Sequence, residues 1–230
     1  MAEFRKGSQE SEPSSIAGDT EENLALLKAR LANVNEKALS RFLRAYGSVE
    51  KAYAGLDNYL KWRLDFGVDF ISDKQPEILN ELKSGKATLL DEKDYNSRPI
   101  ILVTPRLHSS RNRNADSLTK FIVYLLESAA VRCNEEVCDN FCILFDMKGF
   151  SIHSIDYQFT KNMIWLLTNY YPERLGVWLI VNPPIFFSTC WIIMRNWLDE
   201  ITAKKVVFVT SENQLKEYLP LDILPRKLFR

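Results

Sequence analysis

The sequence predicts an α/β protein in which a small helical lobe precedes a domain built on a mainly parallel sheet. Up to about residue 72, apolar residues recur at helical spacing. Beyond it, short β-branched apolar runs alternate with longer helical ones, which is typical of strand–helix–strand crossovers in a sheet covered by helices. The composition is ordinary for a globular protein, at 46% apolar and 26% charged residues. Basic and acidic residues number 30 each, so no overall positive charge favours binding to nucleic acid.

Residues 1–21 are expected to form a disordered tail, because Ser, Glu, Gly and Pro dominate and large apolar residues are almost absent. The tail lacks the apolar stretch of a signal peptide, which favours a cytoplasmic protein. The helical lobe is expected over residues 22–72, with helices over 22–34, 35–47 and 49–66. Gly47 is a plausible C-cap of the second helix, and Ser48 a plausible N-cap of the third.

The α/β domain is expected over residues 73–230. The run at 140–147 is continuously apolar up to its polar end, which is typical of a strand buried on both faces. The helix expected over 116–132 should turn Leu118, Ile122, Leu125, Leu126 and Ala129 inward. The other strands are expected over 87–90, 99–104, 176–181 and 204–210, and the other helices over 77–85, 154–171, 185–198 and 212–219.

The segment from Leu175 to Met194 carries no charge over 20 residues, which is long enough to span a bilayer. Asn182-Pro183-Pro184 lies at its middle, and two prolines break a membrane helix unless neighbours rescue the freed backbone groups. We therefore divide it into a strand over 176–181 and a helix over 185–198. That helix is apolar almost all round. It is either a central core helix, or it lines an apolar cavity on one face and meets a membrane on the other.

The sequence offers little for catalysis or metal binding. It contains no GxSxG, P-loop, GxGxxG or HExxH motif, so an enzyme is not expected. Asp146 ends a buried strand and is expected to order the following loop at Lys148-Gly149. The two histidines have no ligand spacing, so we expect no metal and four reduced cysteines: Cys133, Cys138, Cys142 and Cys190.

The loop over 106–117 carries three arginines with no carboxylate before Asp116. Such a loop is expected to be solvated. The alternative is that it meets anionic lipid, at about 1 kcal/mol for each charge near such a surface. The arginines concerned are Arg106, Arg111 and Arg113.

Five segments in order resemble the CRAL-TRIO lipid-binding family. This family includes phosphatidylinositol/phosphatidylcholine transfer proteins, tocopherol transfer protein and cellular retinaldehyde-binding protein. The resemblance covers about residues 22–228. The segments are LSRFLRAYGSVEKAYAGLDNYLKWR (39–63), FDMKGFSIHS (145–154), NYYPERLGVWLIVNPPIFF (169–187), LDEITAKKVVFV (198–209) and EYLPLDILP (217–225).

The resemblance implies that the sheet floors a deep apolar pocket and that the helix over 185–198 is a gate that contacts the membrane when open. The implied function is to hold one phospholipid, with a phosphatidylinositol-like lipid favoured, and to exchange it at membranes. The lipid would be a ligand, with no cofactor, on a monomer that meets the membrane surface transiently. The implied gate and pocket lining comprises Phe186, Phe187, Cys190, Trp191, Ile193, Met194 and Trp197.

The resemblance also implies head-group residues. Glu173, Thr202 and Lys205 match the family's phosphatidylinositol set, but its arginine position is occupied by Tyr46. This departure puts phosphatidylinositol specificity in doubt. The alternative for Glu173 and Lys205 is an internal salt bridge that braces the gate hinge. Ser151 matches a polar position of the choline-lipid signature.

His153 replaces a small hydroxyl residue in that signature, and it is either a ligand donor or, more often for a lone histidine, a structural residue. Two other functions stay open. In the first, the chain is an interaction module that presents a lipid to a signalling partner. In the second, it binds another hydrophobic ligand, such as a sterol, tocopherol or retinoid. Haem is disfavoured because His108 and His153 are the only histidines, although tyrosine and cysteine can also ligate haem iron. The partial phosphate-binding set favours a phospholipid.

Overall fold

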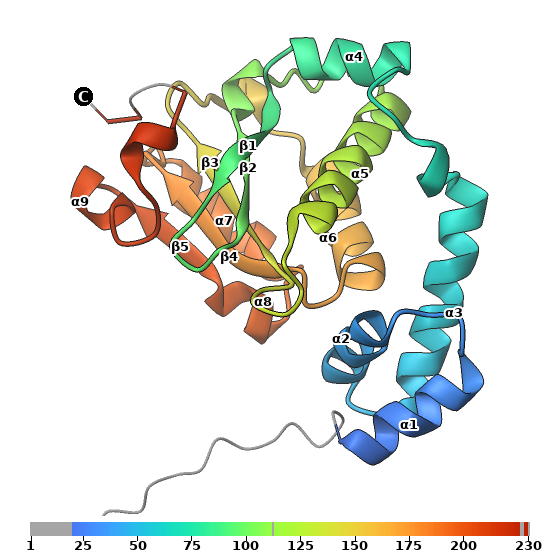
Figure 1. Cartoon of the computed structure of the whole chain (residues 1–230). Helices are drawn as coiled ribbons and strands as arrows, with labels where there is room; N and C mark the ends of the chain where they lie inside the picture. The colour runs from blue at the N-terminus through green and yellow to red at the C-terminus, as the bar shows by residue number, and fades with distance from the viewer. Residues whose placement is uncertain (1–19, 112, 226–227, 230) are drawn as a thin grey trace, which may run out of the picture. The chain divides into compact units, whose positions relative to one another are not determined.

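The computed structural model describes residues 20–111, 113–225 and 228–229 (Figure 1). The chain falls into two compact units, Met1–Asp57 and Asn58–Arg230, and each is described by itself. Almost all of the tail expected over 1–21 lies outside the described residues. The domain boundary expected at residue 72 stays a prediction.

The N-terminal unit is helical, with α1 (Glu21–Arg30), α2 (Glu36–Tyr46) and the first part of α3 (Val49–Phe66). Gly47 ends α2 in the left-handed conformation at φ 70°, as its C-cap position predicts, and its N–H donates to Leu43 O at 2.8 Å. Ser48 Oγ accepts from the Lys51 N–H at the start of α3. The core of this unit is made by Leu27, Leu39, Phe42, Leu43 and Leu56.

The second unit contains a five-stranded sheet in the order β1-β2-β3-β4-β5 (Figure 1). β1 pairs antiparallel with β2, and all other neighbours are parallel, so the predicted mainly parallel sheet is confirmed. Each predicted strand is present within a few residues. Their bounds are β1 Ala87–Lys93, β2 Pro99–Val103, β3 Phe141–Asp146, β4 Leu175–Val181 and β5 Val206–Val209.

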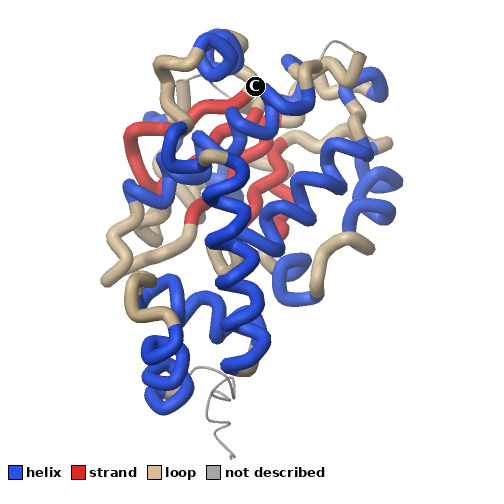
Figure 2. Tube along the Cα trace, turned by 90° about the vertical axis from the view of Figure 1, so that its right-hand side faces the viewer, coloured by secondary structure: helices blue, strands red, loops and turns tan. Residues whose placement is uncertain are grey.

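Helices flank this sheet, as the tube in Figure 2 shows in a second view. They are α4 Pro76–Lys83, α5 Ala115–Arg132, α6 Tyr157–Tyr170, α7 Phe187–Arg195, α8 Glu200–Lys204 and α9 Glu212–Leu215, with 3₁₀ turns η1 Val68–Phe70, η2 Pro105–Leu107, η3 Ile152–Ser154 and η4 Leu221–Ile223. α9 is shorter than the predicted 212–219, because the residues after Leu215 form turns. α7 is also shorter than the predicted 185–198.

The two faces of the sheet carry separate apolar clusters. One face, which includes Ile101, Ile143 and Ile180, is covered by α5, α6 and α7. The opposite face, which includes Ile100 and Leu179, is covered by α9 and the C-terminal segment. Alternate residues of each strand therefore enter different clusters, as the pleat requires.

The inner face of α5 differs slightly from the prediction. Leu118, Leu125, Leu126 and Ala129 are buried as expected, but Ile122 is only partly buried, and Phe121 and Val123 are buried in addition. Because α5 packs against both the sheet and α4, its buried stripe is wider than one helical face.

The uncharged run divides where the sequence predicts. β4 ends at Val181, and Asn182 takes a left-handed conformation at φ 53°. Its backbone N–H donates to Val209 O at 3.1 Å, and its side-chain amide donates to Leu228 O at 2.8 Å. The chain then turns through the two prolines into α7. None of the helices formed by the described residues is long and apolar enough to cross a membrane.

Candidate functional site

α7 packs its inner face on the sheet beside β3, β4 and β5. Phe187, Cys190 and Met194 are buried there. They form one cluster with Met147, Trp178 and Ile180, which we call the α7 cluster. Of the other predicted lining residues, Phe186, Trp191 and Trp197 are partly buried against this cluster. The inner face of α7 is therefore wholly apolar apart from the Cys190 thiol.

The outer face of α7 is exposed and carries two isoleucines beside polar side chains. Ile192 is 66% and Ile193 43% exposed, and Ile185, just before the helix, is 96% exposed. The polar residues exposed on the same helix are Ser188, Thr189 and Arg195. Full burial on every side, which would make α7 a central core helix, is therefore ruled out. The alternative of an apolar inner face and an outer face that meets a membrane remains.

Aromatic contacts from three other segments hold α7 in place. Phe150 stacks near Phe186 at 5.9 Å between ring centroids, and Phe208 of β5 meets Trp191 at 5.5 Å. Tyr157 of α6 lies edge-on to Trp197 at 6.1 Å. A hydrogen bond with the Cys190 thiol, assisted by burial, raises the pKa of Tyr157 to about 12. No local sequence pattern indicates these contacts, because they join segments far apart in the chain.

Two predicted head-group residues meet at the amino-terminal edge of neighbouring parallel strands. Glu173 lies just before β4 and Lys205 just before β5, and Glu173 Oε2 is 3.4 Å from Lys205 Nζ. Both side chains are about a quarter exposed, at 29% and 23%. Thr202 lies one turn before Lys205, and its hydroxyl donates to Asp199 Oδ2 at 2.6 Å. The salt bridge considered as the alternative for Glu173 and Lys205 is thus present.

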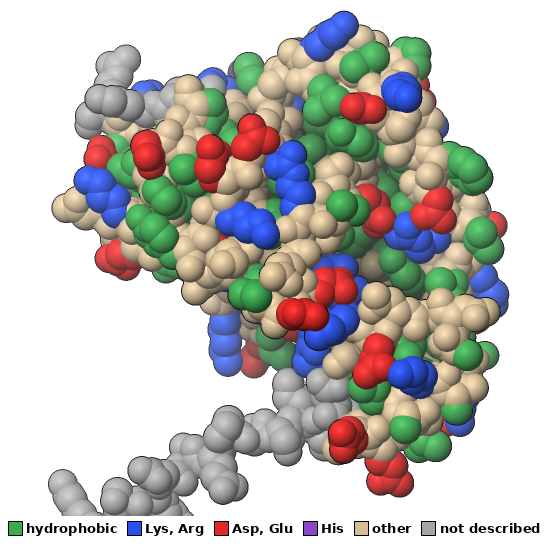
Figure 3. Space-filling view, viewed as in Figure 1, with side chains coloured by type: hydrophobic (Ala, Val, Ile, Leu, Met, Phe, Trp, Pro, Cys, Tyr) green, Lys and Arg blue, Asp and Glu red, His purple; other side chains and the backbone are tan. Residues whose placement is uncertain are grey.

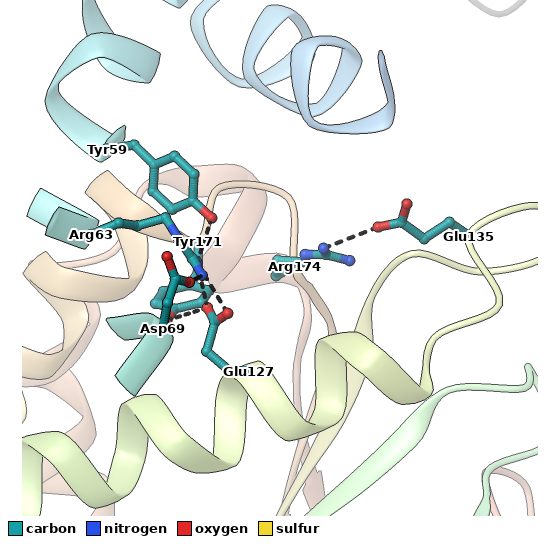
Figure 4. A network of polar contacts seen from close by, with 7 residues as sticks. All are labelled: Tyr59, Arg63, Asp69, Glu127, Glu135, Tyr171 and Arg174. Carbon is teal, nitrogen blue, oxygen red and sulfur yellow. Dashed lines mark hydrogen bonds and ion pairs between the residues drawn. The ribbon is translucent and has the colours of Figure 1, made fainter. Parts of the chain in front are cut away.

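Glu173 adopts left-handed backbone geometry, with φ 57°. This conformation is costly for a residue with a side chain and persists only when the surroundings fix it. On its C-terminal side, Arg174 Nη1 donates to Asp139 O at 2.6 Å. Arg174 Nη2 donates to Glu135 Oε1 at 3.1 Å, as Figure 4 shows. Arg174 O in turn accepts from the Phe141 N–H at 2.9 Å.

The N-terminal side of Glu173 is fixed by a second network, which Figure 4 shows beside the first. The Tyr171 hydroxyl donates to Glu127 Oε1 at 2.8 Å, and Arg63 Nη1 donates to both Glu127 oxygens at 3.0 Å. Arg63 also pairs with Asp69. Burial raises the pKa of Tyr171, so its hydroxyl stays a donor. Sequence reasoning missed Glu127, Tyr171 and Arg174, although the last two flank Glu173 in the matched segment.

Ser151 and His153 lie elsewhere. Both follow the carboxyl end of β3, whereas Glu173 and Lys205 precede β4 and β5. In a parallel sheet these are opposite edges, so the predicted head-group residues divide into two groups. Ser151 is half-buried, and His153 is exposed.

Tyr46 belongs to the N-terminal unit and packs within it. Its ring stacks on Phe42 with 5.9 Å between centroids, and it lies against Gly55. A Cβ atom added at Gly55 would be 2.8 Å from Tyr46 Cε2, so α3 uses a glycine to admit this ring.

The arginine loop is not simply solvated, which corrects the prediction for two of its residues. Arg106 donates to Asp146 Oδ2 at 3.1 Å and to Lys148 O at 3.2 Å, and Arg113 pairs with Asp156. Asp146 is fully buried and accepts from the Lys148 N–H at 3.1 Å, as expected for a residue that orders this loop. The carboxylates that pair with these two arginines belong to segments further along the chain. On the face shown in Figure 3, basic and acidic side chains are likewise interspersed.

The same loop predicts a pH dependence of stability. Burial lowers the pKa of His108, and the positive charges of Lys86 and Arg113 lower it further. Asp156, whose Oδ2 is 3.3 Å from His108 Nε2, raises this pKa but does not outweigh burial. Because the folded state resists protonation, His108 contributes its full stability above the unfolded pKa of about 6.5 and loses it as the pH falls below that value. The pKa of Asp156 is also lowered, because hydrogen bonds outweigh its burial, and its loss follows at still lower pH.

We therefore expect the free energy of unfolding to fall less between about pH 7.5 and 5.5 in His108→Phe than in the wild type. Urea unfolding at the two pH values measures this difference. His153→Phe, at the other and exposed histidine, is the matched control and should keep the wild-type slope. Equal slopes for His108→Phe and the wild type would contradict the assignment.

The cysteines and possible metal ligands do not form a site in the described part of the chain. All four thiols are free, and burial raises the pKa of Cys142 and Cys133. Among the residues that the structure describes, no group of three or more His, Cys, Asp or Glu side chains is arranged to hold a metal ion.

Comparison with known proteins gives concordant matches. A family model described as the CRAL/TRIO domain matches residues 82–228. The "Phosphatidylinositol transfer protein CSR1" of Eremothecium gossypii is 33% identical over 204 residues, covering 84% of this chain and 46% of that protein. The "Sec14 cytosolic factor" of Schizosaccharomyces pombe is 26% identical over 215 residues, covering 85% and 74%. The crystal structure of Sfh5 has the same fold, with a TM-score of 0.67 and 22% identity over 78% of this chain and 67% of that one. The chain spans less than half the length of the first of these relatives.

Proposed function

The chain belongs to the CRAL/TRIO domain family, and on this premise we propose that it is a lipid-transfer protein that holds one phospholipid beneath α7 and exchanges it at a membrane surface. The observation that carries the proposal is α7 itself, a helix with an apolar face on the sheet and two large isoleucines on its exposed face. We propose a monomer without a resident cofactor and without a chemical step, placed in the cytoplasm and in transient contact with membranes. The name of the relative from Schizosaccharomyces pombe, "Sec14 cytosolic factor", supports a cytoplasmic location.

The two faces of α7 suit the two phases between which a lipid must pass. Burial of an acyl chain contributes about 0.8 kcal/mol per CH₂ group, so a lipid leaves an apolar site only for another apolar phase. In our proposal, Phe187, Cys190 and Met194 cover the acyl chain when α7 is closed. The exposed Ile192 and Ile193 enter the membrane interface when it opens.

The head group is proposed to bind at the Glu173–Lys205 pair. A phosphate accepts charge-assisted hydrogen bonds from a lysine, and a carboxylate accepts from inositol hydroxyls. The pair is 3.4 Å apart and still partly exposed, so a phosphate can reach Lys205 Nζ. The name of the relative from Eremothecium gossypii supports phosphatidylinositol as the favoured lipid. Thr202 remains a candidate contact of this head group, whereas Ser151 and His153 remain candidate ligand contacts at the opposite edge of the sheet.

Lipid mass spectrometry of the purified protein tests the proposed function. We expect about one phospholipid per monomer after extraction with organic solvent, and uptake of the same lipid from liposomes. A sterol, tocopherol or retinoid recovered instead would redirect the proposal to another hydrophobic ligand. A protein that carries no lipid and takes none from liposomes is not a transfer protein, and a pull-down with signalling partners would then be the appropriate assay.

Lys205→Met should lower phosphatidylinositol transfer about tenfold, because it removes a hydrogen bond to a charged group worth about 1.5 kcal/mol or more. Phosphatidylcholine transfer should fall much less. Transfer of each labelled lipid between liposomes measures the two rates. Lys204→Met is the matched control, because Lys204 is exposed at the end of α8. Equal loss of both activities would refute the head-group assignment.

The outer face of α7 gives a second prediction. Ile192→Ser combined with Ile193→Ser should lower the rate of transfer between liposomes about tenfold, because each exposed isoleucine contributes apolar area at the interface. The amount of lipid in the purified protein should be unchanged. Ile152→Ser, at an isoleucine that is 67% exposed in η3, is the control. A double variant with wild-type transfer would remove α7 from the membrane contact.

A further inference from the structure

One buried polar group of the α7 cluster has no partner. Trp178 of β4 is 8% exposed, and its Nε1 makes no hydrogen bond within the described part of the chain. Glu81 Oε2 is also buried without a hydrogen bond, but it lies 2.8 Å from Lys86 Nζ. Trp178 thus differs from the other buried polar side chains of this structure.

The surroundings of Trp178 explain why its indole N–H is unpaired. Phe145 lies edge-on to the ring at 5.1 Å between centroids, and Trp191 of α7 lies edge-on at 6.3 Å. Ile180 and Phe187 belong to the same cluster. An unsatisfied buried donor costs the full desolvation of its N–H, whereas phenylalanine at this place would avoid that cost. An acceptor oxygen brought by a bound molecule would remove this cost.

The position of Trp178 indicates which acceptor that is. Its backbone N–H donates to Lys205 O at 2.8 Å, so Trp178 neighbours Lys205, the residue just before the adjacent strand β5. Lys205 is the residue that pairs with Glu173. In a glycerophospholipid the ester carbonyl oxygens lie a few bonds from the phosphate. A phosphate at Lys205 would therefore place an ester carbonyl close to the strand position of Trp178, where the apolar cluster begins.

We propose that Trp178 Nε1 donates a hydrogen bond to an ester carbonyl oxygen of the bound acyl lipid. This rests on the proposed function and deepens it, because it makes the site selective for ester-linked over ether-linked chains. An ether oxygen is a poorer acceptor and leaves the indole N–H without a carbonyl partner. The selectivity comes from the unmet hydrogen bond and not from the size of the ligand.

The test loads the protein from vesicles that contain equal amounts of diacyl and dialkyl phosphatidylinositol in a phosphatidylcholine background. Mass spectrometry of the re-isolated protein gives the ratio of ester to ether lipid, which partial misfolding does not change. We expect the wild type to favour the ester form about tenfold and Trp178→Phe to load the two forms about equally. Trp165→Phe, at a tryptophan of α6 that is 57% exposed, is the control and should keep the wild-type ratio.

Each outcome is decisive. Equal loading of both forms by the wild type would overturn this inference and leave the proposed function standing. A wild-type ratio in Trp178→Phe would show that Trp178 does not cause the preference for ester lipid. A wild type that loads neither form would overturn the proposed function as well. If Trp178→Phe does not fold, the indole ¹⁵N–¹H spectrum of the wild type replaces it. One of the five tryptophan resonances should move downfield with ester lipid and not with ether lipid, and no such movement would contradict the inference.

Discussion

Gly176→Ala should lower the free energy of unfolding by about 2–3 kcal/mol, which corresponds to a fall of about 5–10 °C in Tm for a chain of this size. A Cβ atom at this position of β4 would lie 2.2 Å from Asn140 Oδ1 and 2.6 Å from Arg98 Cδ. Arg98 is buried, and its Nε donates to Asp94 Oδ2 at 2.6 Å, so it has little freedom to move away. β4 must then shift, and with it the Glu173 loop that precedes it.

Thermal unfolding followed by circular dichroism measures the effect. The double variant Gly176→Ala with Asn140→Ala is the internal control, because it removes the closest clashing atom and should recover part of the lost stability. An unchanged Tm in Gly176→Ala would mean that Asn140 and Arg98 give way at no cost. Phosphatidylinositol transfer by the single variant should fall together with its stability.

Glu127→Ala should destabilise the protein by about 2 kcal/mol and lower phosphatidylinositol transfer. It leaves the Tyr171 hydroxyl, in a residue that is 6% exposed, without its acceptor, and it removes one of the two carboxylates that pair with Arg63. The expected cost is below that of a fully buried pair, because Glu127 is 30% exposed and Asp69 still pairs with Arg63. Transfer should fall because Tyr171 fixes one side of the left-handed Glu173.

Urea unfolding and the liposome transfer assay test the two parts separately. Glu127→Gln keeps an acceptor oxygen for Tyr171 and should retain most of the stability, whereas the exposed Glu136 provides the control substitution Glu136→Ala. Wild-type transfer by a destabilised Glu127→Ala would show that this network supports the fold without positioning Glu173.

Much of the fold followed from local patterns. The third helix, 49–66, was predicted at its observed bounds, and the five strands were predicted within a few residues because their apolar runs are bounded by polar and turn residues. The helix predicted over 185–198 was too long at both ends. The residues beyond its two ends include Ile185, Phe186, Trp197 and Leu198, which are apolar, so periodicity carries no signal of where backbone hydrogen bonding stops.

The candidate site was predictable in part. Glu173 and Lys205 were identified from a family resemblance, and the parallel sheet brings them together because each residue precedes one of two neighbouring strands. Trp178 was missed, because nothing in an apolar strand indicates that one indole nitrogen will lack an acceptor. The partners of Arg106 and Arg113 were missed as well, because they lie about 40 residues further along the chain.

The sequence by itself determined the class of fold, the division of the uncharged run at Asn182-Pro183-Pro184 and the family of the chain, because these depend on local spacing and backbone chemistry. Only the tertiary structure decided which charges are paired, which face of α7 is exposed and which buried donor is unmet. Those properties depend on atoms brought together from distant segments, and hydrogen bonding and burial are set by three-dimensional neighbours.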